Sequence, residues 1–314
     1  MYDVLIIGAG PAGLSAAIYA GRKKLKTGVI SVDIGGQGNL TSHIENYPGA
    51  KAQSGMDLMG IFHEQSLHFG AEFIFGKVSK ITKRKDLFEV FMHDGDKHSS
   101  KTLILAFGKV PRKLEIPGEE KFLGKGVSVC ATCDGPLFKN KNVAVVGGGN
   151  SALEAAMDLS HHAKKVYVIH RRKEFRADEV TVDKVKSNPK IEFCLECIPA
   201  EIRGDKFVNS ILVDAAGRKQ KEWAVDGVFL EIGYVVDSSI VKELVEINDK
   251  NEVIINQVCK TSCPGVFAAG DATNVPYKQA IIAAGDGAKA ALEAYHYLTG
   301  AATMGDWDGA KAKK

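Results

Sequence analysis

The sequence predicts an α/β protein built from two Rossmann-like domains. A short apolar run, a glycine-rich turn and a segment with helical periodicity follow one another at residues 3–22, and the same order recurs at residues 142–159. Continuous apolar runs are typical of buried parallel strands, and a glycine turn leading into a helix is typical of the Rossmann βα unit. The length of 314 residues suffices for two domains with separate hydrophobic cores.

The composition is that of an ordinary globular protein. Hydrophobic residues make up 45% and charged residues 25%, and the net charge is +3. A net charge this small gives no general affinity for nucleic acid or membranes. We find no apolar run long enough to cross a membrane, and the chain opens on a strand-like segment rather than a charged leader. We therefore expect a cytoplasmic protein, in which six cysteines are too few for a disulfide scaffold.

The first glycine turn, "GAGPAG", follows the apolar run at residues 3–7 and matches the G-x-G-x-x-G pattern. Its three pattern glycines are Gly8, Gly10 and Gly13. Glycine allows the backbone to approach a pyrophosphate closely, and the N–H groups of the next helix can bind phosphate oxygens. The alternative is a structural turn without a ligand. An acidic residue for a ribose is expected about 20 residues further on, where the sequence offers Ser31 and then Asp33.

The second glycine turn lies in "NVAVVGGGNSALEAAMDL" at residues 142–159, where Gly147, Gly149 and Ala152 match the variant G-x-G-x-x-A. The next strand ends in "VYVIHRRKEFRAD", which is basic where an NAD site has an acid. The basic side chains are His170, Arg171, Arg172 and Arg176. Guanidinium groups bind phosphates in a bidentate manner, so this end favours NADPH over NADH. The alternative is a solvated basic surface.

A third segment supports a pair of cofactors, one a flavin and one a nicotinamide. In "GVFAAGDATNVPYKQAIIAAGDGAKAALEA", residues 265–294, an apolar strand ends at Asp271 and a long alanine-rich helix follows. A carboxylate there can bind polyol hydroxyls, and the helix N-terminus can face an electron-rich ring. Asp271 could equally be a helix cap.

The segment "VSVCATCDGPLF", residues 127–138, holds Cys130 and Cys133, which could bind a metal, close a loop or cycle between thiol and disulfide. A zinc site needs four ligands, and the second pair would have to be Cys194 and Cys197. Their surroundings, "KIEFCLECIPAEI", read as a strand, whereas zinc pairs lie on tight turns. We therefore expect no metal site.

Redox chemistry fits Cys130 and Cys133 better. A C-x-x-C pair at a turn leading into a helix forms a reducible disulfide, and the helix terminus lowers one thiol pKa. Asp134 follows directly and could act as acid and base, or simply cap the helix. The other four cysteines are expected to have no chemical role: Cys194, Cys197, Cys259 and Cys263.

Taken together, these segments resemble the low-molecular-weight thioredoxin reductases of the flavoprotein pyridine nucleotide-disulfide oxidoreductase family. The resemblance runs over nearly the whole chain, through "GAGPAG", "GGQGNLTSHIENYPG", "CATCDG", "GGGNSA", "HRRKEFRAD" and "GVFAAGDAT". The last part is equally similar to the C-terminal part of the flavoprotein component of alkyl hydroperoxide reductase. Departures are "AFG" at 106–108, Gly38 and Asn39 in "GGQGN", "IGYVVD", and the missing ribose acid.

The resemblance implies an NADPH-binding domain, residues 110–243, inserted into an FAD-binding domain, residues 1–109 and 244–314. It implies FAD contacts by Gly8, Gly10, Pro11, Ala12, Gly13, Gln37, Asn46, Asp271 and Gln279, with Ser31 or Asp33 at the ribose. It implies NADPH contacts by Gly149, Asn150, Ser151, His170, Arg171, Arg172 and Arg176.

The resemblance also implies the activity. Electrons would pass from NADPH through FAD to the Cys130–Cys133 pair and on to a separate thioredoxin or glutaredoxin-like disulfide protein. Cys133 would face the flavin and Cys130 would attack the substrate disulfide, while one domain rotates against the other. A homodimer is the expected assembly. Two alternatives remain open: a reductase that feeds a peroxiredoxin through a carrier protein, and a flavin-dependent disulfide oxidase or redox sensor. A ferredoxin–NADP reductase would need no C-x-x-C pair.

Overall fold

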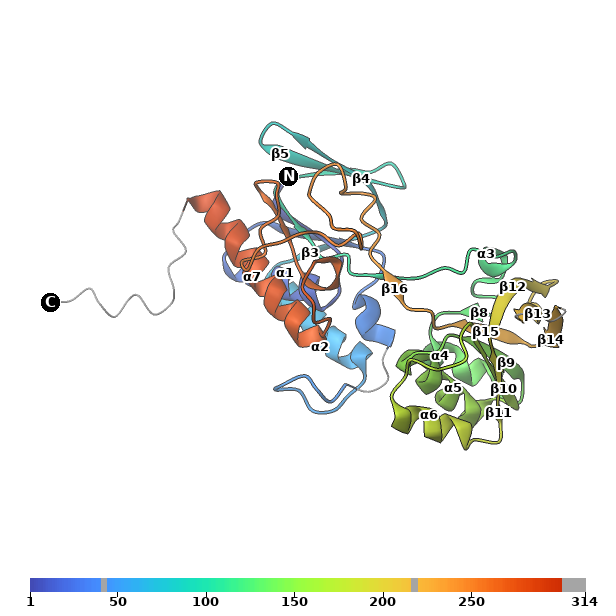
Figure 1. Ribbon diagram of the computed structural model, residues 1–314. Coiled ribbons are helices and arrows are strands. Elements are labelled where there is room, and N and C mark those ends of the chain that lie inside the picture. Colours follow the sequence, from blue (N-terminus) through green and yellow to red (C-terminus); the bar gives the residue numbers. More distant parts are fainter. Residues whose placement is uncertain (41–43, 216–219, 301–314) are drawn as a thin grey trace. The chain divides into compact units, whose positions relative to one another are not determined.

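The computed structural model describes residues 1–40, 44–215 and 220–300, and its chain divides into two compact units (Figure 1). The first unit comprises Met1–Val110 and Val235–Lys314, and the second comprises Pro111–Tyr234. Each unit has its own sheet with helices packed against it, mixed in the first unit and parallel in the second. The predicted α/β class, with one Rossmann-like domain inserted into the other, is confirmed.

The return crossing between the units differs from the prediction. We expected it between residues 243 and 244, and the structure divides at Tyr234 and Val235. The strands at the two crossings, β7 (Val110–Pro111) and β16 (Tyr234–Val235), pair with each other. Beyond them, Val241 and Val245 are buried in a core cluster of the first unit, which ties the segment 235–243 to that unit.

The sheet of the first unit has the order β3-β2-β1-β6-β5-β4, and β17 also pairs with β6. The strands are β1 (Tyr2–Ile7), β2 (Thr27–Ser31), β3 (Glu72–Phe75), β4 (Val78–Arg84), β5 (Leu87–Met92), β6 (Lys97–Leu105) and β17 (Val266–Ala268). The pairs around β1 and β17 are parallel, whereas β4, β5 and β6 pair antiparallel. Strand β1 lies between β2 and β6, so the chain continues on one side of β1 and later returns on the other. The first glycine turn, at the end of β1, therefore lies at a topological switch point.

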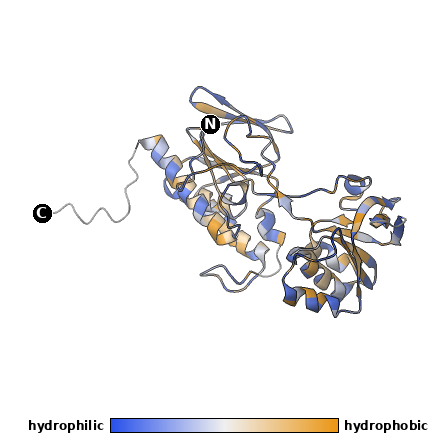
Figure 2. Ribbon diagram, in the orientation of Figure 1, coloured by the Kyte–Doolittle hydropathy of each residue, from blue (hydrophilic) through white to orange (hydrophobic). Residues whose placement is uncertain are grey.

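Helices cover one face of this sheet: α1 (Pro11–Arg22), α2 (Gly55–His68) and α7 (Ala280–Thr299). Figure 2 shows both hydrophilic and hydrophobic residues along α7, as expected for a helix that buries one face. Helix α7 approaches α1 closely at Gly287, where a Cβ would collide with the carbonyl oxygen of Ala12.

The parallel sheet of the second unit has the order β11-β10-β9-β15-β8. Its strands are β8 (Val127–Ser128), β9 (Asn142–Val146), β10 (Lys165–His170), β11 (Ile191–Leu195) and β15 (Gly227–Leu230). Helices α4 (Ala131–Asp134), α5 (Asn150–His162) and α6 (Glu179–Lys186) lie on one face, and an antiparallel sheet of β12 (Cys197–Gly204), β13 (Val208–Ala215) and β14 (Lys221–Ala224) lies on the other (Figure 1). The central strand β9 leads into the second glycine turn.

Short helical turns complete the described chain: α3 (Glu119–Phe122), η1 (Gly36–Leu40), η2 (Gly135–Phe138) and η3 (Gly270–Ala272). Among the helices of the described ranges, none is long and apolar enough to cross a membrane.

Candidate functional site

The first glycine turn has the backbone that a bound pyrophosphate requires. Gly8 has a φ of +106°, and a Cβ there would collide with the Ala106 carbonyl oxygen. A Cβ on Gly13 would collide with the carbonyl oxygen of Gly8. Helix α1 begins with Pro11 at its first position and no side-chain cap on Gly10. The N–H groups of Ala12 and Gly13 are therefore not capped by a described side chain and fit a phosphate.

Of the two candidates for the ribose contact, Ser31 bonds to this turn and Asp33 bonds to the start of η1. The hydroxyl of Ser31, at the end of β2, accepts a hydrogen bond from the Ala9 N–H at 3.2 Å. The carboxylate of Asp33 accepts one from the Gly36 N–H at 3.1 Å. The Ser31 hydroxyl keeps its proton for a second bond, and the second oxygen of Asp33 can still accept one.

Asp271 lies directly after β17, in η3, and faces a lysine that sequence reasoning missed. Lys109 Nζ lies 3.9 Å from Asp271 Oδ2, and the Gln37 side chain donates to the Lys109 carbonyl at 2.7 Å. Asp271 caps neither η3 nor α7, since the cap positions belong to Ala269 and Gln279. Three segments distant in sequence therefore bring these polar groups together.

Burial lowers the pKa of Lys109, with the Asp271 charge opposing this shift. A cation with a lowered pKa beside a proposed flavin site suits an electron-rich cofactor as an electrostatic partner. No local motif marked Lys109, because its neighbours come from distant parts of the chain.

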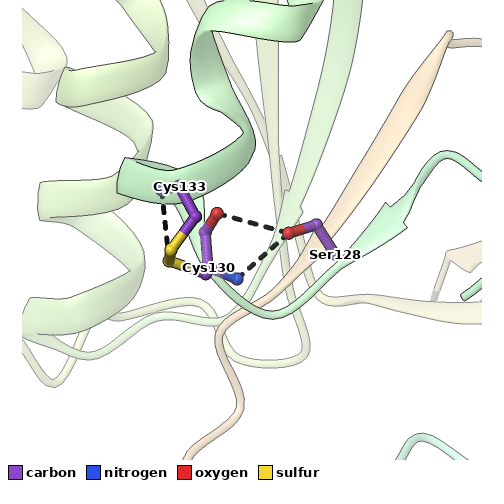
Figure 3. Close-up of a disulfide and its surroundings, with 3 residues drawn as sticks. All are labelled: Ser128, Cys130 and Cys133. Atoms are coloured by element: carbon purple, nitrogen blue, oxygen red, sulfur yellow. Dashed lines mark hydrogen bonds between the residues drawn. A yellow bond between two sulfur atoms is a disulfide. The ribbon is translucent and has the colours of Figure 1, made fainter. Parts of the chain in front are cut away.

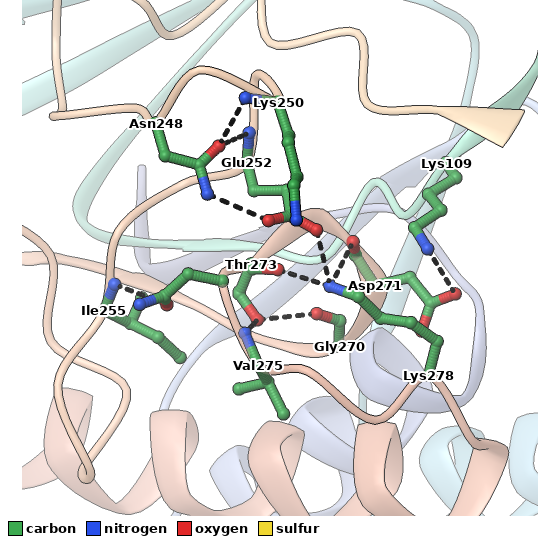
Figure 4. A network of polar contacts seen from close by, with 11 residues as sticks. Lys109, Asn248, Lys250, Glu252, Ile255, Gly270, Asp271, Thr273, Val275 and Lys278 are labelled. Atoms are coloured by element: carbon green, nitrogen blue, oxygen red, sulfur yellow. Dashed lines mark hydrogen bonds and ion pairs between the residues drawn. The ribbon is translucent and has the colours of Figure 1, made fainter.

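A second lysine ties the Asp271 turn to the preceding loop (Figure 4). Lys278 donates to the carbonyl oxygens of Asp271 and Thr273 at 3.3 and 2.5 Å and pairs with Glu252 at 3.0 Å. Next to it, Gln279 precedes helix α7, which has no side-chain cap at its N-terminus. The structure brings Asn46 to this end, where its side chain donates to Gln279 Oε1 at 3.4 Å.

The second glycine turn is equally open to a ligand. Helix α5 begins after Gly149 without a side-chain cap, and a Cβ on Gly149 would meet no atom within 4 Å. The Asn150 side chain is held by Asp178: its amide donates to the carboxylate, and its oxygen accepts the Asp178 N–H, both at 2.8 Å. The exposed Ser151 lies in the first turn of the same helix.

The basic segment after β10 folds back onto this turn. The Arg176 N–H donates to the Gly148 carbonyl at 2.7 Å, and a Cβ on Gly148 would collide with the His170 ring. His170 is buried, and its pKa is lowered by burial and by the charges of the neighbouring arginines. The ring stacks on Phe175 with centroids 5.5 Å apart.

The three arginines of this segment have exposed side chains: Arg171, Arg172 and Arg176. Within the described ranges none of them forms an ion pair with a carboxylate. Guanidinium groups without acidic partners at the end of a Rossmann strand fit an additional phosphate. The structure therefore places His170 and the backbone of Arg176 against the turn that carries the other predicted NADPH residues.

Cys130 and Cys133 form a disulfide at the start of α4 (Figure 3). The Cys133 N–H donates to the Cys130 sulfur at 3.1 Å. The Ser128 hydroxyl accepts the Cys130 N–H at 3.0 Å and donates to the Cys130 carbonyl at 3.3 Å. Cys130 is 8% exposed, whereas Cys133 has an exposed side chain. This N–H can donate to a negatively charged Cys130 sulfur after reduction.

Asp134 lies at the end of α4 with a half-buried side chain. Its backbone N–H donates to the Cys130 carbonyl at 3.1 Å, but its carboxylate makes no capping hydrogen bond to the described chain. Asp134 thus stands at the N-cap position of η2 without a capping hydrogen bond from its side chain, and its carboxylate is free of that bond for proton transfer.

The expectation that Cys194 and Cys197 have no chemical role is contradicted by a second disulfide between them. The sequence around them reads as one strand, but β11 ends at Leu195 and β12 begins at Cys197. Glu196 between them has a φ of +55°, which turns the chain and brings the cysteine Cα atoms to 5.7 Å. Cys259 and Cys263 are free thiols.

Residues 2–287 match the model of the pyridine nucleotide-disulphide oxidoreductase family. The chain is 41% identical to a Helicobacter pylori thioredoxin reductase over 95% of this chain and 99% of that protein. It is 42% identical to a Bacillus subtilis NADH dehydrogenase and 40% identical to an alkyl hydroperoxide reductase subunit of Staphylococcus epidermidis, each over 95% of this chain. It spans 58% and 59% of the length of these last two relatives.

Solved structures of thioredoxin reductases are also similar to this chain. A Lactococcus lactis thioredoxin reductase has a TM-score of 0.85 and 37% identity, covering 96% of this chain and 100% of that one. A T. acidophilum thioredoxin reductase has a TM-score of 0.81 and 33% identity, covering 94% and 97%. The protein therefore belongs to the pyridine nucleotide-disulphide oxidoreductase family and is an oxidoreductase with FAD and NADPH as its cofactors.

Proposed function

We propose that the protein is an NADPH-dependent thioredoxin-disulfide reductase. The observation that carries the proposal is the Cys130–Cys133 disulfide, which lies in the same unit as an open glycine turn and three arginines without carboxylate partners in the described chain. The similarity to a thioredoxin reductase over 99% of that relative's length supports it. The substrate would be the disulfide of thioredoxin or of a glutaredoxin-like protein, and the assembly a homodimer.

The proposed FAD site lies in the first unit and the proposed NADPH site in the second. FAD would be held by Gly8, Gly10, Pro11, Ala12, Gly13, Gln37, Asn46, Asp271 and Gln279, with Ser31 or Asp33 at the ribose and Lys109 beside Asp271. NADPH would be held by Gly149, Asn150, Ser151, His170, Arg171, Arg172 and Arg176. When bound, these cofactors supply the reducing equivalents for opening a disulfide.

The residues of the second unit then carry the exchange with the partner. Once the pair is reduced, the Cys133 N–H can donate to the Cys130 thiolate. The Cys130 thiolate attacks one sulfur of the partner disulfide and forms a mixed disulfide, while the other partner sulfur leaves as a thiolate. Asp134 takes the proton of the Cys130 thiol and passes it to the leaving thiolate. Cys133 then gives its proton to Asp134 and attacks Cys130. The second partner sulfur leaves and takes up that proton, so the internal disulfide is restored and the partner is released as a dithiol.

Attack by Cys130 requires access to its sulfur, which is buried while Cys133 is exposed. We therefore include in the proposal a rotation of one unit against the other about β7 and β16 during each turnover. The rotation would also bring together groups that lie far apart in the chain, because the cysteine pair and the proposed FAD residues belong to different units.

A panel of oxidised thioredoxins and glutaredoxins, assayed for NADPH and NADH oxidation, tests the proposal. We expect FAD-loaded protein to oxidise NADPH only when a disulfide protein is present. Cys130→Ser and Cys133→Ser should each abolish this turnover, and Cys263→Ser, which changes a free thiol in the other unit, should leave it intact. Turnover that survives both active-pair substitutions would overturn the proposal.

One observation favours a second candidate function. The similarity to the alkyl hydroperoxide reductase relative covers 95% of this chain at 40% identity. The protein would then feed a peroxiredoxin through a carrier protein. NADPH oxidation that requires a carrier, a peroxiredoxin and a hydroperoxide together, and that no thioredoxin alone supports, would favour this candidate. Rapid oxygen consumption without any disulfide protein would instead indicate an oxidase.

A further inference from the structure

The second disulfide, Cys194–Cys197, has no part in the proposed reaction, yet it lies beside the proposed NADPH site. We propose that it is a regulatory redox switch whose reduction weakens binding of the nucleotide 2′-phosphate. This inference rests on the proposed function, because it takes the arginine segment as the NADPH site and a dithiol protein as the product.

A backbone contact connects the disulfide to the arginines. Strand β11 pairs in parallel with β10, so that Cys194 lies opposite Ile169 and Leu195 opposite His170. Directly beyond the paired residues, the N–H of Glu196 donates to the Arg172 carbonyl at 3.3 Å. Glu196, one of the two residues enclosed by the disulfide, thus holds the backbone of an arginine proposed to bind the 2′-phosphate.

A side-chain contact makes the same connection from the neighbouring residue. Phe193, next to Cys194, packs edge-on against Phe175 with ring centroids 5.6 Å apart. Phe175 stacks on His170, and the His170 ring lies against Gly148 of the glycine turn. A change in the β11–β12 turn therefore reaches the nucleotide site by two independent routes.

The redox state of the pair decides whether this turn is held. Glu196 has a φ of +55°, a left-handed conformation that side chains other than glycine adopt at a cost. The disulfide joins Cys194 and Cys197 on either side of Leu195 and Glu196, and it fixes that conformation. Opening the disulfide lets Glu196 relax, which removes its N–H from the Arg172 carbonyl and loosens the arginine segment.

A reduced thioredoxin-like dithiol can open the switch. Cys194 is half-buried and Cys197 is 3% exposed, so the partner thiolate attacks the Cys194 sulfur and Cys197 leaves as a thiolate. The second partner thiol then displaces Cys194. The partner ends as a disulfide, Cys194 and Cys197 end as thiols, and the two protons of the partner's thiols pass to them. Accumulating product would thus lower the affinity for NADPH.

Binding of NADP⁺ and NAD⁺ tests the switch without turnover, because neither nucleotide carries a hydride. The protein is the full FAD-loaded chain with Cys130→Ser and Cys133→Ser, so that Cys194 and Cys197 are its only cysteine pair that is bridged in the structure of the described residues. Calorimetry gives the dissociation constants of the oxidised and the thioredoxin-reduced protein, and alkylation with mass spectrometry verifies the thiol state. We expect reduction to raise the NADP⁺ constant by about five-fold or more and to leave the NAD⁺ constant unchanged.

Two further variants of the same protein provide controls. With Cys194→Ser and Cys197→Ser added, the NADP⁺ constant should equal that of the reduced form whatever the reductant. With Cys263→Ser added instead, the response to reduction should persist. If the dissociation constant for NADP⁺ is the same in the oxidised and the reduced protein, the proposed switch is wrong and the proposed function is unaffected. An oxidised protein that does not prefer NADP⁺ to NAD⁺ overturns the proposed NADPH site, and the switch with it.

Discussion

Arg171 and Arg172 carry the nucleotide preference in the proposed function, because they are exposed, lack carboxylate partners in the described chain and follow directly on β10. A surface arginine normally pairs with a carboxylate or is solvated by water, and in either case it contributes little to stability. These two lie on the segment whose backbone is bonded to Gly148 through Arg176 and to the β11–β12 turn through Glu196. Such preorganisation is what a specific phosphate contact needs.

Changing Arg171 and Arg172 to alanine should therefore raise the KM for NADPH and leave that for NADH nearly unchanged. A hydrogen bond to a charged group contributes about 1.5–3 kcal/mol, so we expect a rise of about ten-fold to a hundred-fold. Steady-state kinetics with both nucleotides measures it. Arg203→Ala is the matched control, since Arg203 lies in the same unit and pairs with Glu201. Equal rises for NADPH and NADH would contradict the phosphate assignment.

Glu231 makes the free energy of unfolding depend on pH. Burial raises its pKa to about 7, and the charge of Glu154 adds to the shift. In the unfolded chain a glutamate has a pKa of about 4.3. Between these two values the unfolded chain has lost the proton and the folded chain keeps it, so the free energy of unfolding falls as pH rises from about 4 to about 7.

Glu231→Gln should remove this slope. The variant should gain stability relative to the parent above about pH 7, where the parent carries the buried charge, and lose the advantage near pH 4, where both side chains are neutral. Urea unfolding across this pH range measures the difference. Val146 accepts the Glu231 N–H at 2.8 Å, a backbone bond that glutamine keeps. The same pH slope in parent and variant would show that Glu231 ionises freely in the folded chain.

At the scale of elements, the sequence predicted best what is local. The two strand–turn–helix units around Gly8 and Gly149, and the strand before Asp271, follow from apolar runs and helical spacing alone. The β11–β12 turn was missed, because a single left-handed Glu196 interrupts a segment that otherwise reads as strand. Lys109 was missed because its partner Asp271 lies far along the chain.

The packing of α7 on α1 gives a prediction at this scale. A Cβ at position 287 would collide with the Ala12 carbonyl oxygen, in the turn of α1 proposed to bind phosphate. Gly287→Ala should therefore lower the free energy of unfolding by about 1–3 kcal/mol, the usual cost of overpacking, and weaken FAD retention. Thermal unfolding and the flavin content after dialysis measure the two effects.

Gly285 is a matched control in the same helix, because a Cβ there meets no atom within 4 Å. Gly285→Ala should leave FAD retention unchanged and stabilise the helix by about 0.5–1 kcal/mol, the advantage of alanine over glycine in a helix interior. Equal effects of the two substitutions would mean that the approach of α7 to α1 does not limit the position of the turn.

At the scale of the whole molecule, the inserted arrangement follows from the order of the motifs, since the Asp271 strand of the first fold comes after the complete second one. The return crossing was placed nine residues too late, at 243/244 instead of 234/235. The segment 235–243 has no strand–turn–helix pattern, and its place in the first unit depends on the packing of Val241 and Val245.

The two crossings, β7 and β16, are the only covalent links between the units, because the second unit is one continuous insertion. If turnover requires rotation about them, a cross-link between one engineered cysteine in each unit should abolish turnover with NADPH and thioredoxin. Each half-reaction should still occur in at least one of the cross-linked proteins. The first is seen as the absorbance change on adding NADPH alone, and the second as the change on adding a dithiol alone. Lengthening the cross-linker should restore turnover progressively, and a cross-link within one unit should have no effect.

Full turnover with the shortest cross-linker at every pair of positions would mean that the exchange needs no rotation, and that Cys130 becomes accessible by a local change around α4 instead.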